Sequence, residues 1–322
     1  MEIAVTEATT IATAGEILVE FVSHKKNCGL SEISPYSGPY PSGAPAIFLD
    51  QAARMGAHTE LFGGVGNDGF GRSVLARLNR DGVGTKGVTV SDQGSTGVAF
   101  VTYYDNGQRD FIFHLANTPA DSFAVEPHHL DLAHTWLHVS AASLGNAHLR
   151  DAIMGLAARV EAAGGKITCD PNARPELMRD ASASRALADV VARSHILMPS
   201  TSDLEFMFPG NPEDESLERL SDTKVETLVL KRGAAGATII QGTERRDLEP
   251  HPVDELDPTG AGDCFCGTFV ALVAAGMDAF EAGRLANAAG AIAVTRRGPM
   301  EGNSDPDEIA AFLEQHRSQR TP

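Results

Sequence analysis

Residues 257–269, DPTGAGDCFCGTF, join three small residues to a carboxylate and then to an apolar run. Gly260, Ala261 and Gly262 carry no bulky side chain that would block approach to their N–H groups, and Cys264–Ala275 continues as a predicted buried helix. The first turn of a helix leaves its N–H groups without internal partners and carries the positive end of the helix dipole. The stretch therefore predicts an anion-binding helix start.

Asp263 lies where its charge would repel an anion bound at this helix start, unless the two act together. A transferring phosphoryl group needs hydrogen-bond donors for its developing charge and a residue that orients the attacking hydroxyl. Asp263 suits the second role, as the acceptor of the hydroxyl proton. At a helix start we expect its carboxylate to stay ionised and to be a weak base at neutral pH. The alternative is that Asp263 only caps its helix, and the spacing alone does not separate the two interpretations.

Strand-like apolar runs alternate with helix-like stretches along most of the chain. Ile11–Glu20 is predicted as a first strand, and residues 166–170, 195–198 and 227–230 as short strands between helical segments. Such alternation indicates βαβ units, and hence a mostly parallel sheet with helices on both faces.

Two segments, residues 21–40 and 94–115, break this pattern with β-prone sequence. The second contains Asp105-Asn106-Gly107 between β-rich runs, and Asn-Gly between strands is the strongest short-range hairpin signal. We expect the two segments to form a small separate sheet that covers one edge of the main domain.

The composition limits the partners and the compartment. The chain has 322 residues, 42% of them hydrophobic, and a formal net charge of −17, which disfavours nucleic acid as a partner. None of its four cysteines has zinc-type spacing, so we expect reduced, mostly buried thiols and a cytoplasmic location. The sequence shows no secretory signal and no apolar run long enough to span a membrane, so no membrane partner is expected.

A second glycine-rich stretch, residues 64–69, fits the pattern G-x-G-x-x-G. It follows a predicted strand and precedes a predicted helix, and Asp92 lies where a ribose-binding acid is expected, so a dehydrogenase is one interpretation. However, Asn67-Asp68 places an anion inside the turn that would receive pyrophosphate. This favours a tight turn with Asp68 as a helix cap.

The motif D-P-T-G-A-G-D-x-F at 257–265 resembles the C-terminal signature of the ribokinase-like (PfkB) sugar kinases, and residues 63–71, GGVGNDGFG, resemble their N-terminal signature. The resemblance extends from Gly15 to Gly298 and displaces the dehydrogenase interpretation. It implies a ribokinase-like fold, a three-layer α/β/α domain with a mostly parallel central sheet plus a small β-sheet lid.

The same resemblance implies a division of the chain. Residues 1–20, 41–93 and 116–322 would form the large nucleotide- and substrate-binding domain, and residues 21–40 and 94–115 the small β lid.

In this family the Asp of G-A-G-D is the catalytic base, which falls on Asp263, and the preceding Gly260, Ala261 and Gly262 would form the anion hole. The resemblance also implies an ATP site. Its implied residues are Lys231, Gly233, Gly236, Ser200 and Asn287. For Lys231 the alternative is a surface lysine, and for Asn287, implied beside the adenine, it is a residue on an exposed helix face.

Residues 199–203, PSTSD, stand where many members of the family have N-x-x-E, a motif that acts on Mg²⁺ and phosphate largely through water. Ser200 replaces the Asn and Asp203 replaces the Glu, so oxygen ligands are kept. The resemblance thus implies Mg²⁺ as a cofactor with Asp203 as the metal residue, acting through water. K⁺, which many relatives bind, is a further candidate.

The implied sugar-binding residues come from several partial motif matches: Glu20, Ser42, Gly43, Arg109, Asn172 and Arg174. Glu20 ends a G-E-x-x-x-D-like stretch, and Ser42-Gly43 begin a G-G-A-x-x-N-like stretch in which Ile47 replaces the Asn. Asn172 and Arg174 belong to a D-x-N-x-R stretch, like that of fructokinases and 2-keto-3-deoxygluconate kinases. The alternative for Arg174 is a structural loop arginine.

In the acid-sugar kinases, a lid strand after G-x-R carries Tyr-x-Arg near the substrate carboxylate. Here Arg109 ends the G-x-R, but the aligned run is Phe113-His114-Leu115. A desolvated carboxylate without a bidentate arginine would be costly, so a neutral ketose such as tagatose or fructose is favoured. His114 or Asn117 is then a candidate contact for its hydroxyls.

The sequence therefore predicts ATP-dependent phosphorylation of a primary hydroxyl of a neutral ketohexose. A 2-keto-3-deoxygluconate kinase is the first alternative, followed by a nucleoside kinase and a catalytically silent sugar-binding regulator. A homodimer formed through the lid is also predicted, since exposed β surface favours pairing.

Overall fold

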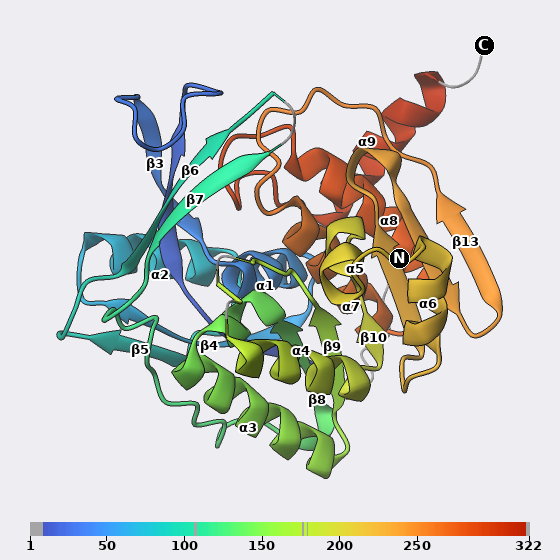
Figure 1. Cartoon of the computed structure of the whole chain (residues 1–322), viewed down its shortest axis with the longest axis horizontal. Helices are drawn as coiled ribbons and strands as arrows, with labels where there is room; N and C mark the ends of the chain where they lie inside the picture. Colours follow the sequence, from blue (N-terminus) through green and yellow to red (C-terminus); the bar gives the residue numbers. More distant parts are fainter. Residues whose placement is uncertain (1–8, 106–107, 176, 179, 320–322) are drawn as a thin grey trace.

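Nine strands form one large sheet within residues 9–105, 108–175, 177–178 and 180–319, the part of the chain that this computed structural model describes. Their order is β13-β12-β11-β10-β9-β8-β1-β4-β5 (Figure 1). Their bounds are β1 (Thr10–Ala14), β4 (His58–Gly66), β5 (Gly87–Ser91), β8 (Thr135–Ser140), β9 (Lys166–Asp170), β10 (Ile196–Leu197), β11 (Thr227–Lys231), β12 (Ala237–Gln241) and β13 (Glu244–Leu248). In this order, every pair of neighbouring strands from β11 to β5 is parallel. At the other edge, β12 pairs antiparallel with β11, and β13 pairs antiparallel with β12.

Helices cover both faces of this sheet, because successive residues of each strand point to opposite sides. In β11, for example, Val229 packs into one hydrophobic cluster while Leu228 and Leu230 pack into the other. One face carries α1 (Ala44–Arg54), α2 (Gly69–Arg80), α7 (Ala261–Ala274), α8 (Ala279–Ala293) and α9 (Pro306–Gln319). The other carries α3 (Ala147–Ala163), α4 (Ala181–Arg193), α5 (Thr201–Met207) and α6 (Glu213–Ser221). Short 3₁₀ helices span Leu132–His134, Ala141–Gly145 and Gly233–Ala235.

A separate four-stranded sheet stands beside helix α2, at the upper left of Figure 1. Its order is β3-β2-β6-β7, with β2 (Leu18–Ser23), β3 (Tyr36–Ser42), β6 (Gly97–Tyr103) and β7 (Arg109–His114). We call it the lid sheet. The predicted three-layer α/β/α fold with a small extra sheet is therefore confirmed.

The predicted hairpin is also confirmed, since β6 and β7 pair antiparallel. Asn106 and Gly107 of its expected turn lie outside the described residues.

The prediction of one strand over Ile11–Glu20 is wrong. The chain leaves the large sheet after Ala14 and enters the lid sheet at Leu18, so two strands in different sheets replace it. At the break, a side chain on Gly15 would collide with Pro45 and Ser143. The expected lid boundaries at 20/21 and 40/41 fall within β2 and β3, which belong to the lid sheet over their full lengths.

The lid sheet has two distinct faces, which follow from the alternation of its strands. On β7, Arg109, Phe111 and Phe113 are partly buried, whereas Ile112 and His114 are exposed. Tyr103 of β6 pairs with Arg109 across the hairpin, so both side chains lie on the inner face.

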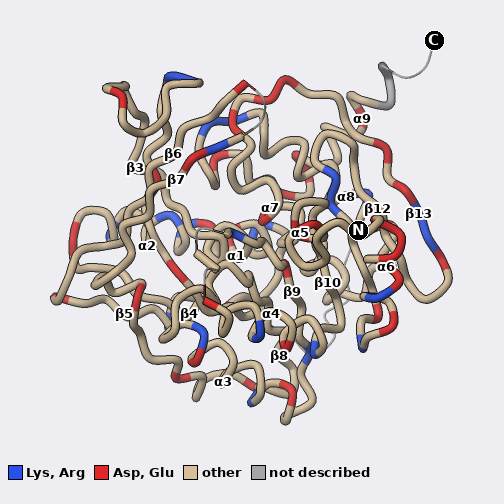
Figure 2. The backbone as a smooth tube through the Cα atoms, in the orientation of Figure 1, with Lys and Arg blue, Asp and Glu red and all other residues tan. Residues whose placement is uncertain are grey.

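Charged residues of both signs are interspersed along the chain in Figure 2. None of the described helices has the length and apolar character needed to cross a bilayer.

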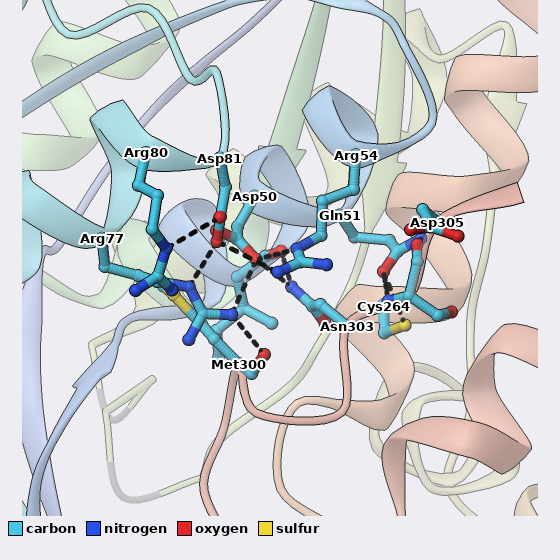
Figure 3. Close-up of polar contacts among 12 residues, drawn as sticks. Asp50, Gln51, Arg54, Arg77, Arg80, Asp81, Cys264, Met300, Asn303 and Asp305 are labelled. Atoms are coloured by element: carbon cyan, nitrogen blue, oxygen red, sulfur yellow. Dashed lines mark hydrogen bonds and ion pairs between the residues drawn. The ribbon is translucent and has the colours of Figure 1, made fainter. Parts of the chain in front are cut away.

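A buried charged cluster joins α1, α2 and the segment before α9 (Figure 3). The Arg77 guanidinium pairs with Asp81, donates to the Met300 carbonyl at 2.7 Å, and lies 3.5 Å from Asp50 Oδ2. Asn303 Nδ2 donates to the same Asp50 oxygen at 2.7 Å. Burial raises the pKa of Asp50 to about 7 although Arg77 opposes the shift. Arg77 therefore compensates buried carboxylates and holds the backbone at Met300.

Replacing Arg77 with Met should lower the free energy of unfolding by about 3–5 kcal/mol, because it leaves buried carboxylates without their partner. Denaturant unfolding measures this. Arg80→Met is the matched control: Arg80 also pairs with Asp81, but its side chain is 66% exposed. Its loss should change the stability by no more than about 0.5 kcal/mol. Equal effects of the two variants would contradict the role given to Arg77.

Candidate active site

A cavity of about 580 Å³ lies at the carboxyl ends of β9 and β11, the edge where open α/β sheets bind ligands. Asp170 is the last residue of β9 and Lys231 the last of β11. Ser200, which follows β10, forms a bridge with Lys231. The opposite wall comes from the start of α7, from α8 and from Arg109 of the lid sheet. A cavity of this size suits a small-molecule ligand.

Most of the residues predicted for the site line this one cavity, although they come from distant parts of the chain. They are Arg109, Asn172, Arg174, Ser200, Asp203, Lys231, Gly233, Gly236, Gly260, Ala261, Gly262, Asp263 and Asn287. Three residues predicted for the sugar, Glu20, Ser42 and Gly43, are not among the residues that line it.

The start of α7 presents open backbone to the cavity. Gly260 precedes the helix with a left-handed φ of 80°, and a side chain here would collide with the Pro299 carbonyl oxygen. No side chain of the described residues caps this helix, and the Ala261 N–H makes only a 3.4 Å contact with Pro258 O. The first-turn amides are therefore available to an anion.

Asp263 lies in the first turn of α7, beside these amides. Burial, followed by the negative charge of Asp170, raises the pKa of Asp263 to about 7, while Lys231, Arg174 and Arg109 oppose the shift. The expectation of a fully ionised, weak base is therefore wrong, because desolvation outweighs the helix terminus and the nearby cations. A carboxylate with a pKa near neutrality is a stronger proton acceptor than an ordinary aspartate.

Lys231 is a largely enclosed residue of the site, with 12% of its side chain exposed, and not a surface lysine. Its ammonium forms an ion pair with Asp170, lies 3.5 Å from Cys266 Sγ, and would contact a side chain placed on Gly262 at 3.6 Å. Burial alone would lower the pKa of Lys231, but Asp170 reverses the effect, so the pKa is raised. Lys231 therefore stays charged next to the start of α7.

Asp203 and Ser200 form hydrogen bonds with each other. Asp203 Oδ2 accepts from Ser200 N at 2.7 Å and from Ser200 Oγ at 2.6 Å, and Asp203 Oδ1 accepts from Ala173 N at 2.7 Å. Together they form the capping box of α5. Direct coordination of a metal by Asp203 would break this cap, but a carboxylate oxygen with one partner can still accept from a water. The arrangement thus fits the predicted water-mediated role.

Arg109 of the lid sheet and Arg174 of the loop after β9 line the cavity with Asp263, and the charges of both lower its pKa. Burial lowers the pKa of Arg109, and the like charge of Arg174 adds to this. Neither arginine has an ion-pair partner among the described residues. Asn172, between the strand and Arg174, donates to Ser140 Oγ at 3.1 Å.

Glu20 and Ser42 contact each other in adjacent strands of the lid sheet, where Ser42 Oγ donates to Glu20 Oε2 at 3.1 Å. Both are buried, and Glu20 Oε1 has no hydrogen-bond partner among the described residues. Burial, followed by the charge of Asp257, raises the pKa of Glu20 to about 8. Gly43, with φ 109°, directly precedes α1.

At the other end of the cavity, two glycines shape a turn after β11. Gly233 and Gly236 both have positive φ, and a side chain on Gly236 would collide with the Leu248 carbonyl. Asn287 on α8 donates its side-chain amide to Glu249 O at 2.8 Å. This contact holds the loop at residues 250–253 that closes the cavity.

Two other sequence-based expectations are not met. His114 lies on the outer face of the lid sheet, in a separate groove with Phe100 and Ile112, because its position on β7 alternates with that of Arg109. Asn117 is exposed and is not among the residues that line the cavity. The preference for a helix cap at Asp68 is confirmed, since its side chain accepts from Gly71 N at 2.8 Å.

Asp170 and Tyr103 were not singled out by the sequence. Asp170 ends an apolar strand of a parallel sheet, and this position could have identified it. Tyr103 reaches Asp257, ahead of α7, only through the register of the hairpin. The adjacent Tyr104 is indistinguishable from it in sequence.

Residues 9–306 match the family described as pfkB family carbohydrate kinase. The chain belongs to this family of sugar kinases. Among its relatives is a fructokinase of Vibrio alginolyticus, 30% identical over 283 residues that cover 85% of this chain and 92% of the relative.

Solved structures of similar proteins confirm the ribokinase-like fold. An E. coli putative ribokinase II in complex with ATP and Mg²⁺ superposes with a TM-score of 0.89 at 39% identity, over 96% of this chain and all of the other. An aminoimidazole riboside kinase of Salmonella enterica, complexed with its riboside and an ATP analogue, gives a TM-score of 0.81 at 25% identity, covering 94% of this chain and 99% of the other.

If Asp263 is the proton acceptor, kcat/KM for the sugar should rise about tenfold per pH unit below pH 7 and level off above it, because only the ionised carboxylate accepts a proton. A steady-state pH profile at saturating nucleotide measures this. Replacing Arg174 with Met removes a charge that lowers the pKa of Asp263, so the rising limb should move to higher pH. A profile that stays flat from about pH 5.5 to 8.5 would contradict the assignment.

Proposed function

We propose that this sugar kinase transfers the terminal phosphoryl group of ATP to a primary hydroxyl of a neutral ketohexose, either tagatose or fructose. One observation carries the proposal: Asp263, with a pKa near 7, lies in a cavity beside uncapped amides at a helix start. The amides and Lys231 stabilise the negative charge of the phosphoryl group during its transfer, and Asp263 accepts the proton of the attacking hydroxyl.

The nucleotide is placed at the β11 end of the cavity, between the turn at Gly233–Gly236 and Asn287 of α8. The similarity to the E. coli protein in complex with ATP and Mg²⁺ supports this choice. Mg²⁺, when bound, neutralises phosphate charge, and Asp203 and Ser200 would hold its water shell. The chain's own contribution is the ammonium of Lys231, which Asp170 keeps in place next to Gly262.

The sugar is placed between Asp263 and the inner face of the lid sheet. The buried Oε1 of Glu20 has no partner among the described residues, and a sugar hydroxyl would supply one, since a buried oxygen without a partner is costly. Asn172, which lines the cavity, is a second candidate contact. The fructokinase among the relatives supports a ketohexose. The lid sheet covers the reacting groups and excludes water, which would otherwise receive the phosphoryl group.

A second candidate is 2-keto-3-deoxygluconate. It is favoured by Arg109 and Arg174, two guanidinium groups in the cavity without ion-pair partners among the described residues. A sugar carboxylate would pair with them. In the ketohexose proposal, the same two charges instead lie next to the phosphoryl group and Asp263.

A coupled assay of ADP release, run with tagatose, fructose, ribose, 2-keto-3-deoxygluconate and adenosine, tests the proposal. We expect turnover with tagatose or fructose and a kcat about 10²–10⁴-fold lower for Asp263→Asn. Parallel runs with and without K⁺ test whether K⁺ is a cofactor as well.

Turnover of the sugar acid alone would establish the second candidate, and turnover of adenosine alone a nucleoside kinase. If the wild type and Asp263→Asn bind sugar and ATP equally and neither turns over any substrate, the protein is a sugar-binding regulator.

The homodimer expected from the sequence remains part of the proposal. The outer face of the lid sheet carries the exposed Ile112, which is 43% exposed, and the nearby Ile33, which is 94% exposed, beside a groove. Light scattering should give twice the mass of one chain, and Ile112→Glu should give the mass of one chain. If the wild type has the mass of one chain even at high concentration, the dimer is contradicted.

A further inference from the structure

Tyr103 is the one side chain of the inner lid face with a hydrogen bond, among those described, to the segment that leads into α7. Its hydroxyl donates to Asp257 Oδ1 at 2.5 Å and also contacts Thr259 Oγ1. Both partners of the hydroxyl, Asp257 and Thr259, lie within three residues of Gly260, the residue before α7. Tyr103 is 8% exposed and Asp257 is 1% exposed, so water does not compete for this contact.

Asp257 also binds two backbone N–H groups near the start of α7. The oxygen that accepts from Tyr103 also accepts from Thr259 N at 3.0 Å, and its second oxygen accepts from Gly298 N at 2.9 Å. The carbonyl of Pro299, the next residue, is the group against which Gly260 packs. A single buried carboxylate thus fixes both segments that shape the start of α7.

The lid end of this connection is equally rigid. Tyr103 packs with Val22 and Val101 in the core of the lid sheet, and Tyr40 of β3 packs against Gly298. Burial raises the pKa of Tyr103, so its hydroxyl keeps its proton and remains a donor across the working pH range.

We propose that Tyr103 is a positioning residue, whose hydroxyl couples the closed lid sheet to the orientation of the first-turn amides of α7. The inference rests on the proposed function, since these amides are there the donors to the phosphoryl group. When the lid sheet is in place, the bond to Asp257 holds residues 257–260 in the geometry that presents the amides. Donors aligned before the reaction lower the barrier, and small misplacements are costly.

Tyr103→Phe removes only the hydroxyl and keeps the ring in the lid core. We expect kcat to fall about 10- to 100-fold, with KM for the sugar and for ATP within about threefold of the wild type, because the ground-state contacts stay while the amides lose alignment. Tyr104→Phe is the matched control. Tyr104 is the next residue along, and its hydroxyl donates to Asp110 at 2.6 Å on the exposed side, so its kinetics should match the wild type.

Thr259→Val keeps the shape of the side chain and removes the second contact of the Tyr103 hydroxyl. It should lower kcat less than Tyr103→Phe does, and the double variant should be no slower than Tyr103→Phe alone, because both act through one connection. This second variant also keeps the inference testable if Tyr103→Phe does not fold.

Hydrogen exchange of the amides in residues 257–263 separates this inference from the proposed function. Without any substrate, exchange should be faster in Tyr103→Phe than in the wild type and unchanged in Tyr104→Phe. If no sugar is turned over, the proposed function fails, but faster exchange still supports the coupling.

A wild-type kcat in Tyr103→Phe, or a rise in KM for the sugar alone, would overturn the inference. So would unchanged exchange, or a lower melting temperature with unaltered kcat, because each would make Tyr103 a sugar contact or a packing residue only.

Discussion

The fit of Gly260 against the carbonyl of Pro299 is the contact on which the site depends. It requires a residue without a side chain in a left-handed conformation, and it sets the direction in which α7 begins. That direction points the free amides and Asp263 into the cavity at the ends of β9 and β11. Lys231 places positive charge beside this helix start, and Asp257 holds the backbone that precedes it.

The electrostatics of the site follow from burial combined with pairing. Asp170 binds Lys231 and at the same time raises the pKa of Asp263, so one carboxylate fixes a cation and makes a neighbouring acid more basic. Lys231, Arg174 and Arg109 limit that rise. The result is a carboxyl group that titrates near neutrality, next to positive charge that is present before any phosphate arrives. Preorganised charge of this kind needs no reorganisation during the reaction.

The strand–helix alternation predicted the fold class and residues 257–269 predicted the start of α7, because both are local patterns, whereas most of the other cavity residues were implied by the resemblance to the ribokinase-like family. The sequence did not predict the break at Gly15 between two sheets, since nothing in the apolar run Ile11–Glu20 marks a change of sheet. Nor did it predict the pKa of Asp263, which depends on Asp170, 93 positions away in sequence (263 − 170). His114 was misplaced because the face that a strand residue occupies depends on register, which a motif alignment does not give.

The order of strands in the large sheet has a consequence for how the chain reaches this structure. β1 ends at Ala14, yet its two neighbours are β4 and β8, and the latter ends at Ser140. During synthesis, the middle of the sheet therefore stays incomplete until β8 has left the ribosome. Contacts between segments this far apart form slowly, and the apolar edge of β1 is exposed in the meantime. The nascent protein is thus most vulnerable to aggregation before its eighth strand emerges.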